Sequence, residues 1–367
     1  MRVLLLGGTG AMGISLMEIL ANQGNEVDVT SRKNRISTKE NIHYICGNAH
    51  DDGFLNDLLK RKYDAIVDFM IYTTDEFEKR YKRLLQSTAH YIFLSSSRVY
   101  ANSDSLIKED SDRLLDVCKD SQYLATDEYA LSKARQENYL FLSKNKNYTI
   151  VRPYITYNSN RLQLGVLEKE YWLQRALNGK TIIFQNEIST RKTTLTYGYD
   201  VAVAISILIG NHNSYGEAFH ITGEESLLWK DVLDLYKEVL ISHNVHNIRI
   251  IEEPIDDVAR LLGCYYQIHY DRLYNREFDN SKIKSLCGNS LSFTPISVGL
   301  SQSLSSFLKN PEFLYNNLLW EAHCDGVARE KKTMVVDGFK NNIKYFIFRN
   351  TPRLGRIFVK TPKKHSI

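Results

Sequence analysis

The chain has 367 residues, of which 43% are hydrophobic and 25% are charged, and its formal net charge is +4. This length can bury a sizeable core in one large or two smaller domains, and so small a net charge does not by itself indicate a nucleic-acid-binding protein. The five cysteines are dispersed without a CxxC spacing, which favours free thiols in a reducing cytoplasm over a disulfide framework or a metal site. No apolar run approaches the roughly 20 residues of a membrane helix. We therefore expect a cytoplasmic protein without a transmembrane segment and without a bound metal.

Strands and helices alternate along residues 1–155. Short apolar runs predict the strands, and apolar residues at helical spacing between them predict the helices. The strands are apolar on both faces, which is typical of a parallel sheet covered by helices on both sides. We expect an α/β fold with a Rossmann-like, doubly wound parallel sheet, with strands at 3–6, 27–31, 41–46, 64–71, 91–97 and 148–154 and helices at 14–22, 76–88 and 127–145.

The pattern changes after residue 155. Residues 156–310 predict a smaller α/β lobe that binds substrate, although some of its segments are expected to return to the first domain. Residues 311–367 form a basic extension, in which no acidic residue follows Phe339 whereas eight basic residues do. A solvated or partner-bound tail is the simpler interpretation, and contact with an anionic membrane surface is the alternative. The lobe is expected to contain helices at 171–177, 200–209 and 226–240 and strands at 181–184 and 218–222.

A glycine-rich loop follows the first strand. Gly7, Gly10 and Gly13 give the spacing G-x-x-G-x-x-G between a strand and a helix. A pyrophosphate needs backbone N–H groups directed at it without side chains in the way, and the helix N-terminus adds a positive potential. Tight turns also use glycine for purely structural reasons. We expect a dinucleotide site lined by Gly7, Thr9, Gly10, Ala11, Met12 and Gly13.

The end of the second predicted strand indicates which dinucleotide is bound. A dinucleotide fold usually places an acid here to hold the ribose 2′-hydroxyl, but this sequence has Ser31 and Arg32. Asp28 lies too early in the strand to take that role. A hydroxyl and a guanidinium suit a 2′-phosphate, so we expect NADP(H), with NAD(H) as the alternative. A solvated basic turn is the structural explanation of the same residues.

A tyrosine and a lysine lie one helical turn apart in the helix predicted at 127–145. Tyr129 and Lys133 share a face of that helix. A free phenol ionises near about pH 10, so a phenol that acts as a base needs an adjacent ammonium or a positive cofactor ring. Three serines at 95–97 end the fifth strand, at the sheet edge where ligands bind. The alternative is ordinary surface-helix chemistry.

These motifs, in this order, resemble the short-chain dehydrogenase/reductase superfamily, specifically the extended NAD-dependent epimerase/dehydratase family. The resemblance covers most of residues 1–310 and rests on the segments GGTGAMG, FLSSSRVY, YALSK, VRPYITY, GEAFHITGEESLLWKDVL and FDNSKIKSLCG. It implies that Tyr129 is the acid/base, that Lys133 holds the cofactor ribose and assists Tyr129, and that Ser96 binds the substrate oxygen, with Ser97 as the fallback. It also implies cofactor contacts from Asn48, Ala49, Phe69 and Pro153.

The sequence departs from the family pattern at several positions. Asn48 stands where many members have an aspartate that contacts adenine, and the fourth strand ends with DFMIY in place of His-Leu-Ala-Ala. Thr193 stands where members often carry an arginine that binds the substrate diphosphate. The candidate replacements, between which the sequence does not choose, are Arg191, Lys192 and Arg272.

The resemblance implies an NAD(P)-dependent epimerase or reductase that acts on a nucleotide-activated sugar by hydride transfer. It also implies a homodimer, formed through the helix near Glu76 and the helix that carries Tyr129. The competing hypothesis is a non-catalytic NADP- or RNA-binding protein on the same fold. The complete set of serine, tyrosine and lysine argues against it, because a sensor needs no general base.

A sugar-nucleotide dehydratase is the third hypothesis. Members that eliminate water resemble Ser/Thr-Asp-Glu at the fifth strand end, whereas this chain has Ser96, Ser97 and Arg98 there. A hydroxyl and a guanidinium do not replace a carboxyl acid and a carboxylate base at neutral pH, so we expect no elimination. Asp127 and Glu128 would be the substitutes if water were lost.

Overall fold

The computed structural model describes residues 1–315, 317–332 and 338–350. They form two compact units, each built from several stretches of the chain. The first unit contains Met1–Asn158, Thr194–Glu225 and Glu277–Ile296, and the second contains the described residues of Ser159–Thr193, Ser226–Arg276 and Ser297–Ile367. All the residues predicted to bind the cofactor or to act in catalysis belong to the first unit.

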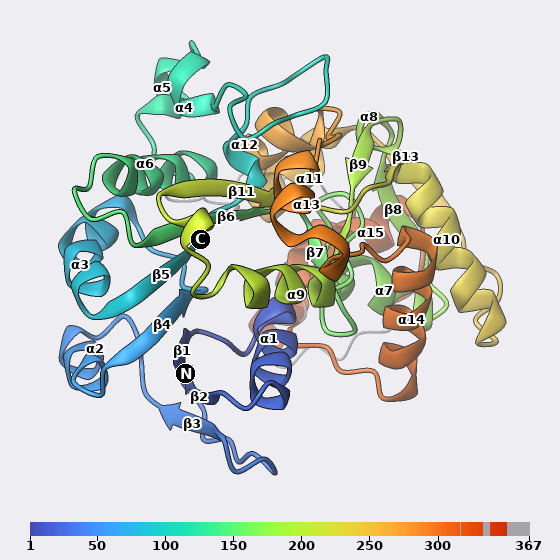
Figure 1. The fold of residues 1–367 in the computed structure, drawn as a ribbon. Helices are drawn as coiled ribbons and strands as arrows, with labels where there is room; N and C mark the ends of the chain where they lie inside the picture. The colour runs from blue at the N-terminus through green and yellow to red at the C-terminus, as the bar shows by residue number, and fades with distance from the viewer. Residues whose placement is uncertain (316, 333–337, 351–367) are drawn as a thin grey trace. The chain divides into compact units, whose positions relative to one another are not determined.

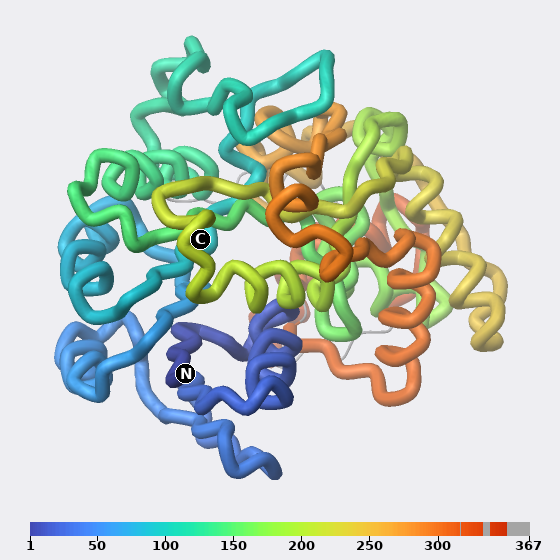
Figure 2. The backbone as a smooth tube through the Cα atoms, viewed as in Figure 1, coloured from blue at the N-terminus to red at the C-terminus, as the bar shows by residue number. Residues whose placement is uncertain are grey.

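A seven-stranded sheet forms the centre of the first unit (Figure 1). Its strands are β1 (Arg2–Leu6), β2 (Glu26–Ser31), β3 (Ile42–Cys46), β4 (Tyr63–Asp68), β5 (Thr88–Leu94), β6 (Tyr148–Pro153) and β11 (Glu217–Ile221). All neighbouring strands are parallel, in the order β11-β6-β5-β4-β1-β2-β3. β11 returns from late in the chain to pair with β6, as the tube in Figure 2 shows.

Helices cover both faces of this sheet (Figure 1). One face carries α1 (Ala11–Asn22), α9 (Gly198–Leu208) and α13 (Ser281–Cys287), and the other carries α2 (Asp52–Leu59), α3 (Thr74–Gln86) and α6 (Tyr129–Phe141). Because side chains alternate along a strand, Val3 and Leu5 pack with the first group and Leu4 and Leu6 with the second. The predicted Rossmann-like parallel sheet is confirmed.

Several element ends differ from the sequence prediction. The helix predicted at 127–145 is α6, which begins at Tyr129 with Glu128 as its N-cap. The helix predicted at 226–240 begins only at Trp229, because Ser226–Leu228 form strand β12. Three short helices between β5 and α6 were not predicted, since so few residues carry no periodicity; they are η1 (Ser97–Val99), α4 (Leu114–Val117) and α5 (Ser121–Leu124).

The second unit is the smaller one and also combines strands with helices. Strands β8 (Ile182–Gln185) and β13 (Ile250–Glu253) pair in parallel, and Trp172 and Trp320 are fully buried. Across the described part of the chain, no helix is both long enough and apolar enough to span a membrane. The longer helices of this unit are α7 (Lys169–Leu177), α10 (Trp229–Ser242), α11 (Ile255–Leu262), α14 (Ile296–Lys309), α15 (Leu318–Val327) and α16 (Phe339–Asn350).

Candidate active site

The glycine loop makes a sharp turn between β1 and α1. Gly7 has a φ of +70°, a backbone conformation that residues other than glycine rarely adopt. Its N–H donates a hydrogen bond of 2.8 Å to Thr30 Oγ1 on the neighbouring strand, and Thr9 N–H donates one of 2.9 Å to the Gly7 carbonyl. These bonds hold the loop at the carboxyl end of the sheet.

The glycines of this loop differ in the space around them. Gly10 is the N-cap of α1, no side chain caps the helix there, and a Cβ built on Gly10 meets no atom within 4 Å. A Cβ on Gly13 would lie only 2.5 Å from the carbonyl oxygen of Gly8, so Gly13 lets the helix pack against the loop. The space beside Gly10 at the N-terminus of α1 is therefore open, and a bound pyrophosphate requires such space. The G-x-x-G-x-x-G motif does not include Gly8. The two consecutive glycines in GGTG were the available sequence signal that Gly8 is also needed in the loop.

The other predicted cofactor residues lie at, or just after, the carboxyl ends of β2, β3, β4 and β6. Ser31 is the last residue of β2, is buried, and accepts a hydrogen bond of 3.2 Å from Lys33 N–H. Asn48 and Ala49 follow β3, where the exposed Asn48 side chain accepts a bond from His50 N–H and the Ala49 carbonyl accepts one from Arg80. All these positions lie at the edge of the sheet where ligands bind in this architecture. Arg32 is exposed beside Ser31, Phe69 follows β4, and Pro153 ends β6.

Asp28 has a structural environment. Its carboxylate is fully buried and accepts hydrogen bonds from Tyr63 Oη at 2.7 Å and Arg2 at 2.9 Å. Asp28 pairs in register with Leu4 in the middle of β1, away from the strand end. Its carboxylate is therefore held in the interior, away from the carboxyl end of β2 where the ribose is expected to bind.

The three serines at the end of β5 make different hydrogen bonds. Ser95 Oγ donates to Glu137 at 2.6 Å and Ser97 Oγ donates to the Arg152 carbonyl at 2.8 Å, and both side chains are buried. Ser96 is the N-cap of η1, and its Oγ accepts a bond of 3.2 Å from Arg98 N–H. In these contacts Ser96 uses only its acceptor, so its hydroxyl proton is available for a ligand oxygen.

Tyr129 is the first residue of α6 and is partly buried. The guanidinium carbon of Arg98 lies 5.2 Å from the centre of the Tyr129 ring, and Arg98 pairs with Glu128 at 2.5 Å. Glu128 also caps α6, since it accepts a bond of 2.9 Å from Ala130 N–H. Arg98 thus links the serine turn to the start of the tyrosine helix. The sequence analysis mentions Arg98 only as a residue that does not replace the carboxyl groups of a dehydratase, and it does not predict this link.

Lys133 is buried one turn along α6. Its Nζ donates to the Leu94 carbonyl at 2.7 Å and to the Met70 carbonyl at 3.3 Å, which lie at the end of β5 and just after β4. Burial lowers the pKa of Lys133 to about 8, against the opposing effect of the Asp68 and Glu137 carboxylates. The ammonium of Lys133 is therefore easier to deprotonate than that of an exposed lysine.

Asp68 is a buried acid at the end of β4 that the sequence prediction missed. It accepts hydrogen bonds from Tyr91 Oη at 2.7 Å, from Tyr72 Oη at 3.1 Å and from Met70 N–H at 3.0 Å. Burial raises the pKa of Asp68, while these donors and Lys133 act in the opposite direction. A polar residue within the apolar run DAIVDFMI was the available signal.

Glu137 connects α6 to two strands. It receives two hydrogen bonds of 2.8 Å from Arg152 on β6 and one from Ser95 at the end of β5. Burial alone raises the pKa of Glu137, but Arg152, Ser95 and Arg113 more than offset it and hold the pKa below its usual range. This charged cluster fixes the helix that carries Tyr129 and Lys133 relative to the serines.

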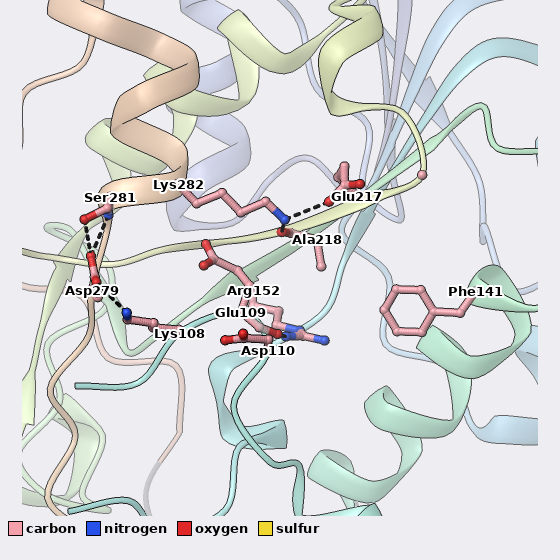
Figure 3. Close-up of a pocket in the computed structure, with 11 residues that line it drawn as sticks. Lys108, Glu109, Asp110, Phe141, Arg152, Glu217, Ala218, Asp279, Ser281 and Lys282 are labelled. Carbon is pink, nitrogen blue, oxygen red and sulfur yellow. Dashed lines mark hydrogen bonds and ion pairs between the residues drawn. The ribbon is translucent and has the colours of Figure 1, made fainter. Parts of the chain in front are cut away.

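A cavity of about 460 Å³ lies beside this cluster and is separate from the predicted site residues (Figure 3). Its charged groups are mostly paired with one another: Lys282 bonds Glu217 at 2.8 Å, and Lys108 lies 3.7 Å from Asp279. Arg152, which Figure 3 draws among the residues that line the pocket, is already held by Glu137. The cavity therefore offers few uncommitted groups to a ligand.

The two carboxylates considered for water elimination are held in structural contacts. Asp127 accepts a bond of 2.9 Å from Thr74 N–H at the start of α3 and one of 3.3 Å from Arg135. Glu128 pairs with Arg98 as described above. Among the described residues, no group of three or more His, Cys, Asp or Glu side chains is arranged to hold a metal ion.

Comparison with known proteins places this arrangement in a family. The model of the NAD dependent epimerase/dehydratase family matches residues 3–222. A curated relative, the chloroplast stem-loop binding protein of 41 kDa b from Arabidopsis thaliana, is 26% identical over 240 residues, which are 61% of this chain and 59% of that protein. The chain thus spans about 59% of the length of this relative.

Several solved structures share the fold. The UDP-glucose 4-epimerase from Bifidobacterium longum, in complex with NAD+ and UDP, is 16% identical with a TM-score of 0.63, covering 85% of this chain and 99% of that one. The UDP-glucuronic acid 4-epimerase from Bacillus cereus is 16% identical with a TM-score of 0.61, covering 84% and 99%. A putative epimerase from Burkholderia cenocepacia is 18% identical with a TM-score of 0.62, covering 83% and 97%. With the family model matching more than half of its residues, the chain belongs to the NAD-dependent epimerase/dehydratase family.

Proposed function

We propose that this protein is an NAD(P)-dependent enzyme that epimerises, reduces or oxidises a nucleotide-activated sugar by hydride transfer, without eliminating water. The observation that carries the proposal is the grouping of Ser96, Arg98, Tyr129 and Lys133 at the carboxyl edge of the sheet that also ends in the open glycine loop. The similar folds named as UDP-sugar 4-epimerases support the class of substrate.

The cofactor would lie across the carboxyl edge of the sheet. Ser31 and Arg32 would face the ribose 2′-position, which favours NADP(H) over NAD(H). When bound, the nicotinamide supplies the hydride acceptor and donor. The pyrophosphate would be held by Gly7, Thr9, Gly10, Ala11, Met12 and Gly13, and the remaining contacts would come from Asn48, Ala49, Phe69, Lys133 and Pro153.

The chain's own residues would move the proton. Tyr129 Oη accepts the proton of the sugar hydroxyl as the ketone forms and returns it as the ketone is reduced. Ser96 donates a hydrogen bond to the same oxygen, because its hydroxyl proton is not used in its bond with Arg98 N–H. The cation of Arg98, which lies over the Tyr129 ring, would favour the phenolate form, and Lys133 would assist from one turn along α6. Asp127 and Glu128 take no part in this scheme, since both are held in structural contacts.

Turnover of a panel of nucleotide sugars by the purified full chain tests this function. The absorbance of the reduced cofactor detects net redox chemistry, and product mass and stereochemistry detect epimerisation. Tyr129→Phe should lower the rate by about 10²–10⁴-fold while cofactor affinity stays nearly constant, because only the proton-transfer group is lost. A product lighter by one water would contradict the reaction type.

RNA binding is the alternative function, and the name of the curated relative is the observation that favours it. Retention of RNA by the purified protein, with an affinity that falls steeply with salt, would support this alternative. In that case Tyr129→Phe should leave RNA affinity unchanged, and no nucleotide sugar in the panel should be converted.

We further propose that the protein forms a homodimer through α3 and α6 in the cytoplasm. The two helices pack side by side, with the Tyr81 and Tyr139 ring centroids 5.4 Å apart. The exposed face of α3 is charged, with Asp75, Glu78, Lys79 and Lys82, so an interface there should weaken at high salt. Light scattering at micromolar concentration, at low and high salt, measures this, and a monomer under both conditions would contradict it. The five free thiols support a reducing compartment.

A further inference from the structure

Helix α16 packs against α15 with one of its faces. Tyr345 and Phe348 are buried beside Ala322 of α15, and Tyr345 Oη donates a hydrogen bond to Asp325. A Cβ on Gly326 would lie 2.5 Å from the Arg349 carbonyl, so the two helices approach closely. These contacts fix the orientation of α16 about its own axis.

A second apolar stripe on α16 is exposed. Phe339 is 80% exposed, Ile343 43% and Phe346 65%. Their spacing of four and three residues puts them on one side of the helix, away from the buried Tyr345 and Phe348. A single exposed apolar residue is ordinary, but an aligned set of three on a helix held by its other face indicates an interaction surface.

The charged residues of α16 itself are all basic. Lys340 and Lys344 are exposed on α16, and Arg349 lies in its last turn. No acidic residue occurs in the sequence from 338 to 367, which contains eight lysines and arginines. Aromatic and aliphatic side chains beside a basic face are the composition of a helix that lies in the interface of an anionic membrane.

We propose that α16 is a docking surface for an anionic phospholipid membrane. Phe339, Ile343 and Phe346 enter the boundary between headgroups and acyl chains, and Lys340 and Lys344 contact the lipid phosphates. The basic residues alone do not explain why three apolar side chains are exposed. The apolar side chains alone do not explain why the charged residues of α16 are all basic. An anionic membrane accounts for both observations. The protein remains peripheral, because α16 has only 12 residues. The proposal does not depend on the reaction that the protein catalyses.

Co-sedimentation of the full chain with vesicles tests this surface. We expect binding to phosphatidylcholine vesicles that contain phosphatidylglycerol, and weak binding to phosphatidylcholine alone. Each basic residue near an anionic surface raises partitioning by about fivefold, so the double variant Lys340→Glu/Lys344→Glu should bind at least about tenfold more weakly. The double variant Phe339→Ser/Phe346→Ser should show a loss of similar size. Leu142→Ser is the matched control, because Leu142 is 84% exposed in the other unit and should not change binding.

Three results would overturn the proposal. The first is equal binding to neutral and anionic vesicles. The second is a Phe339→Ser/Phe346→Ser variant that binds like the wild type, which would leave only a non-specific attraction of the basic residues. The third is a full chain that does not bind while a chain ending at residue 350 does, which would show that residues 351–367 cover the stripe. Thermal unfolding of each variant confirms that it is folded, and turnover of sugar nucleotides plays no part in the assay.

Discussion

The guanidinium of Arg98 lies over the ring of Tyr129, with 5.2 Å between the guanidinium carbon and the ring centre. The same residue donates its backbone N–H to Ser96 Oγ. Arg98 therefore touches both the proposed proton-transfer group and the proposed oxygen-binding group. Its ion pair with Glu128, in which both side chains are about 15% exposed, keeps the guanidinium in place.

Removal of the Arg98 charge should make Tyr129 harder to ionise. In Arg98→Gln the midpoint of phenol ionisation should move to higher pH, since a nearby cation stabilises the phenolate. The absorbance difference between each protein and its Tyr129→Phe counterpart isolates this titration. Arg98→Lys should restore most of the effect.

The wild type and the Arg98 variants share the other charged groups near Tyr129. Glu128 and Asp127 precede it, Lys133 follows on α6, and Arg135 pairs with Asp127. A Tyr129 titration that is the same in wild type and Arg98→Gln would show that Arg98 has only a structural role. Because the readout needs no substrate, it is independent of whether sugar nucleotides are converted.

Substitution of Gly10 should mainly weaken cofactor binding, whereas substitution of Gly13 should mainly lower stability. Gly10→Leu places a side chain in the open space above α1, so cofactor affinity should fall by at least about 100-fold with little change in stability. Gly13→Ala forces a methyl group against the Gly8 carbonyl and should lower the free energy of unfolding by about 1–3 kcal/mol. Equilibrium titration with NAD(P) and denaturant unfolding measure the pair. A folded Gly10→Leu protein with unchanged affinity would remove the loop from the cofactor site.

The serines at the end of β5 should separate activity from stability. Ser96→Ala should lower turnover by about 10²–10³-fold, with a loss of stability of only about 0.5–2 kcal/mol, because its side chain caps a short turn. Ser97→Ala removes the buried donor to the Arg152 carbonyl and should cost about 1–3 kcal/mol of stability. If Ser97→Ala abolished turnover in a stable protein while Ser96→Ala did not, the fallback assignment would be the correct one.

The preference for NADP(H) depends on the residues after β2. Ser31→Asp introduces a carboxylate that repels a 2′-phosphate and accepts bonds from ribose hydroxyls, so the affinity ratio should shift toward NAD(H). Arg32→Ala should weaken NADP(H) binding without affecting NAD(H). Isothermal titration with both cofactors measures the ratio, and a wild type that binds NAD(H) more tightly would refute the preference.

The buried ammonium of Lys133 should limit turnover at alkaline pH. Its pKa of about 8 lies below the value in an unfolded chain, so the charged form is present below pH 8 and is lost as the pH rises. Turnover should fall through pH 8. Between pH 8 and the ordinary lysine pKa of about 10.4, Lys133 is protonated in the unfolded chain but neutral in the folded protein. The contribution of Lys133 to the free energy of unfolding therefore rises with pH over this range. Asp68→Asn removes a charge that supports the ammonium and should move the fall to lower pH, and an unchanged profile would exclude this coupling.

Short-range patterns were enough to predict the sheet and its ligand edge. A buried parallel strand is apolar on both faces wherever it occurs, and glycine spacing between a strand and a helix depends on neighbours in the sequence. The placement of Tyr129 and Lys133 one turn apart on α6 follows from helical geometry alone. The choice of Ser96 came from the family resemblance and stays a prediction, whereas the different hydrogen bonds of the three serines are seen only in the structure.

The partners of those residues were decided only by the tertiary structure. Arg98 reaches Tyr129 from a turn that precedes it by about 30 residues, and Lys133 finds its acceptors at Leu94 and Met70. Glu137 collects Arg152 and Ser95 from two different strands. A buried polar group must find a hydrogen-bond partner wherever the fold brings one close, and those partners lie tens of residues away, beyond the range of any local pattern. The sequence therefore determined which residue types stand at the site's edge, and the packing of α6 on β5 and β6 determined what each of them binds.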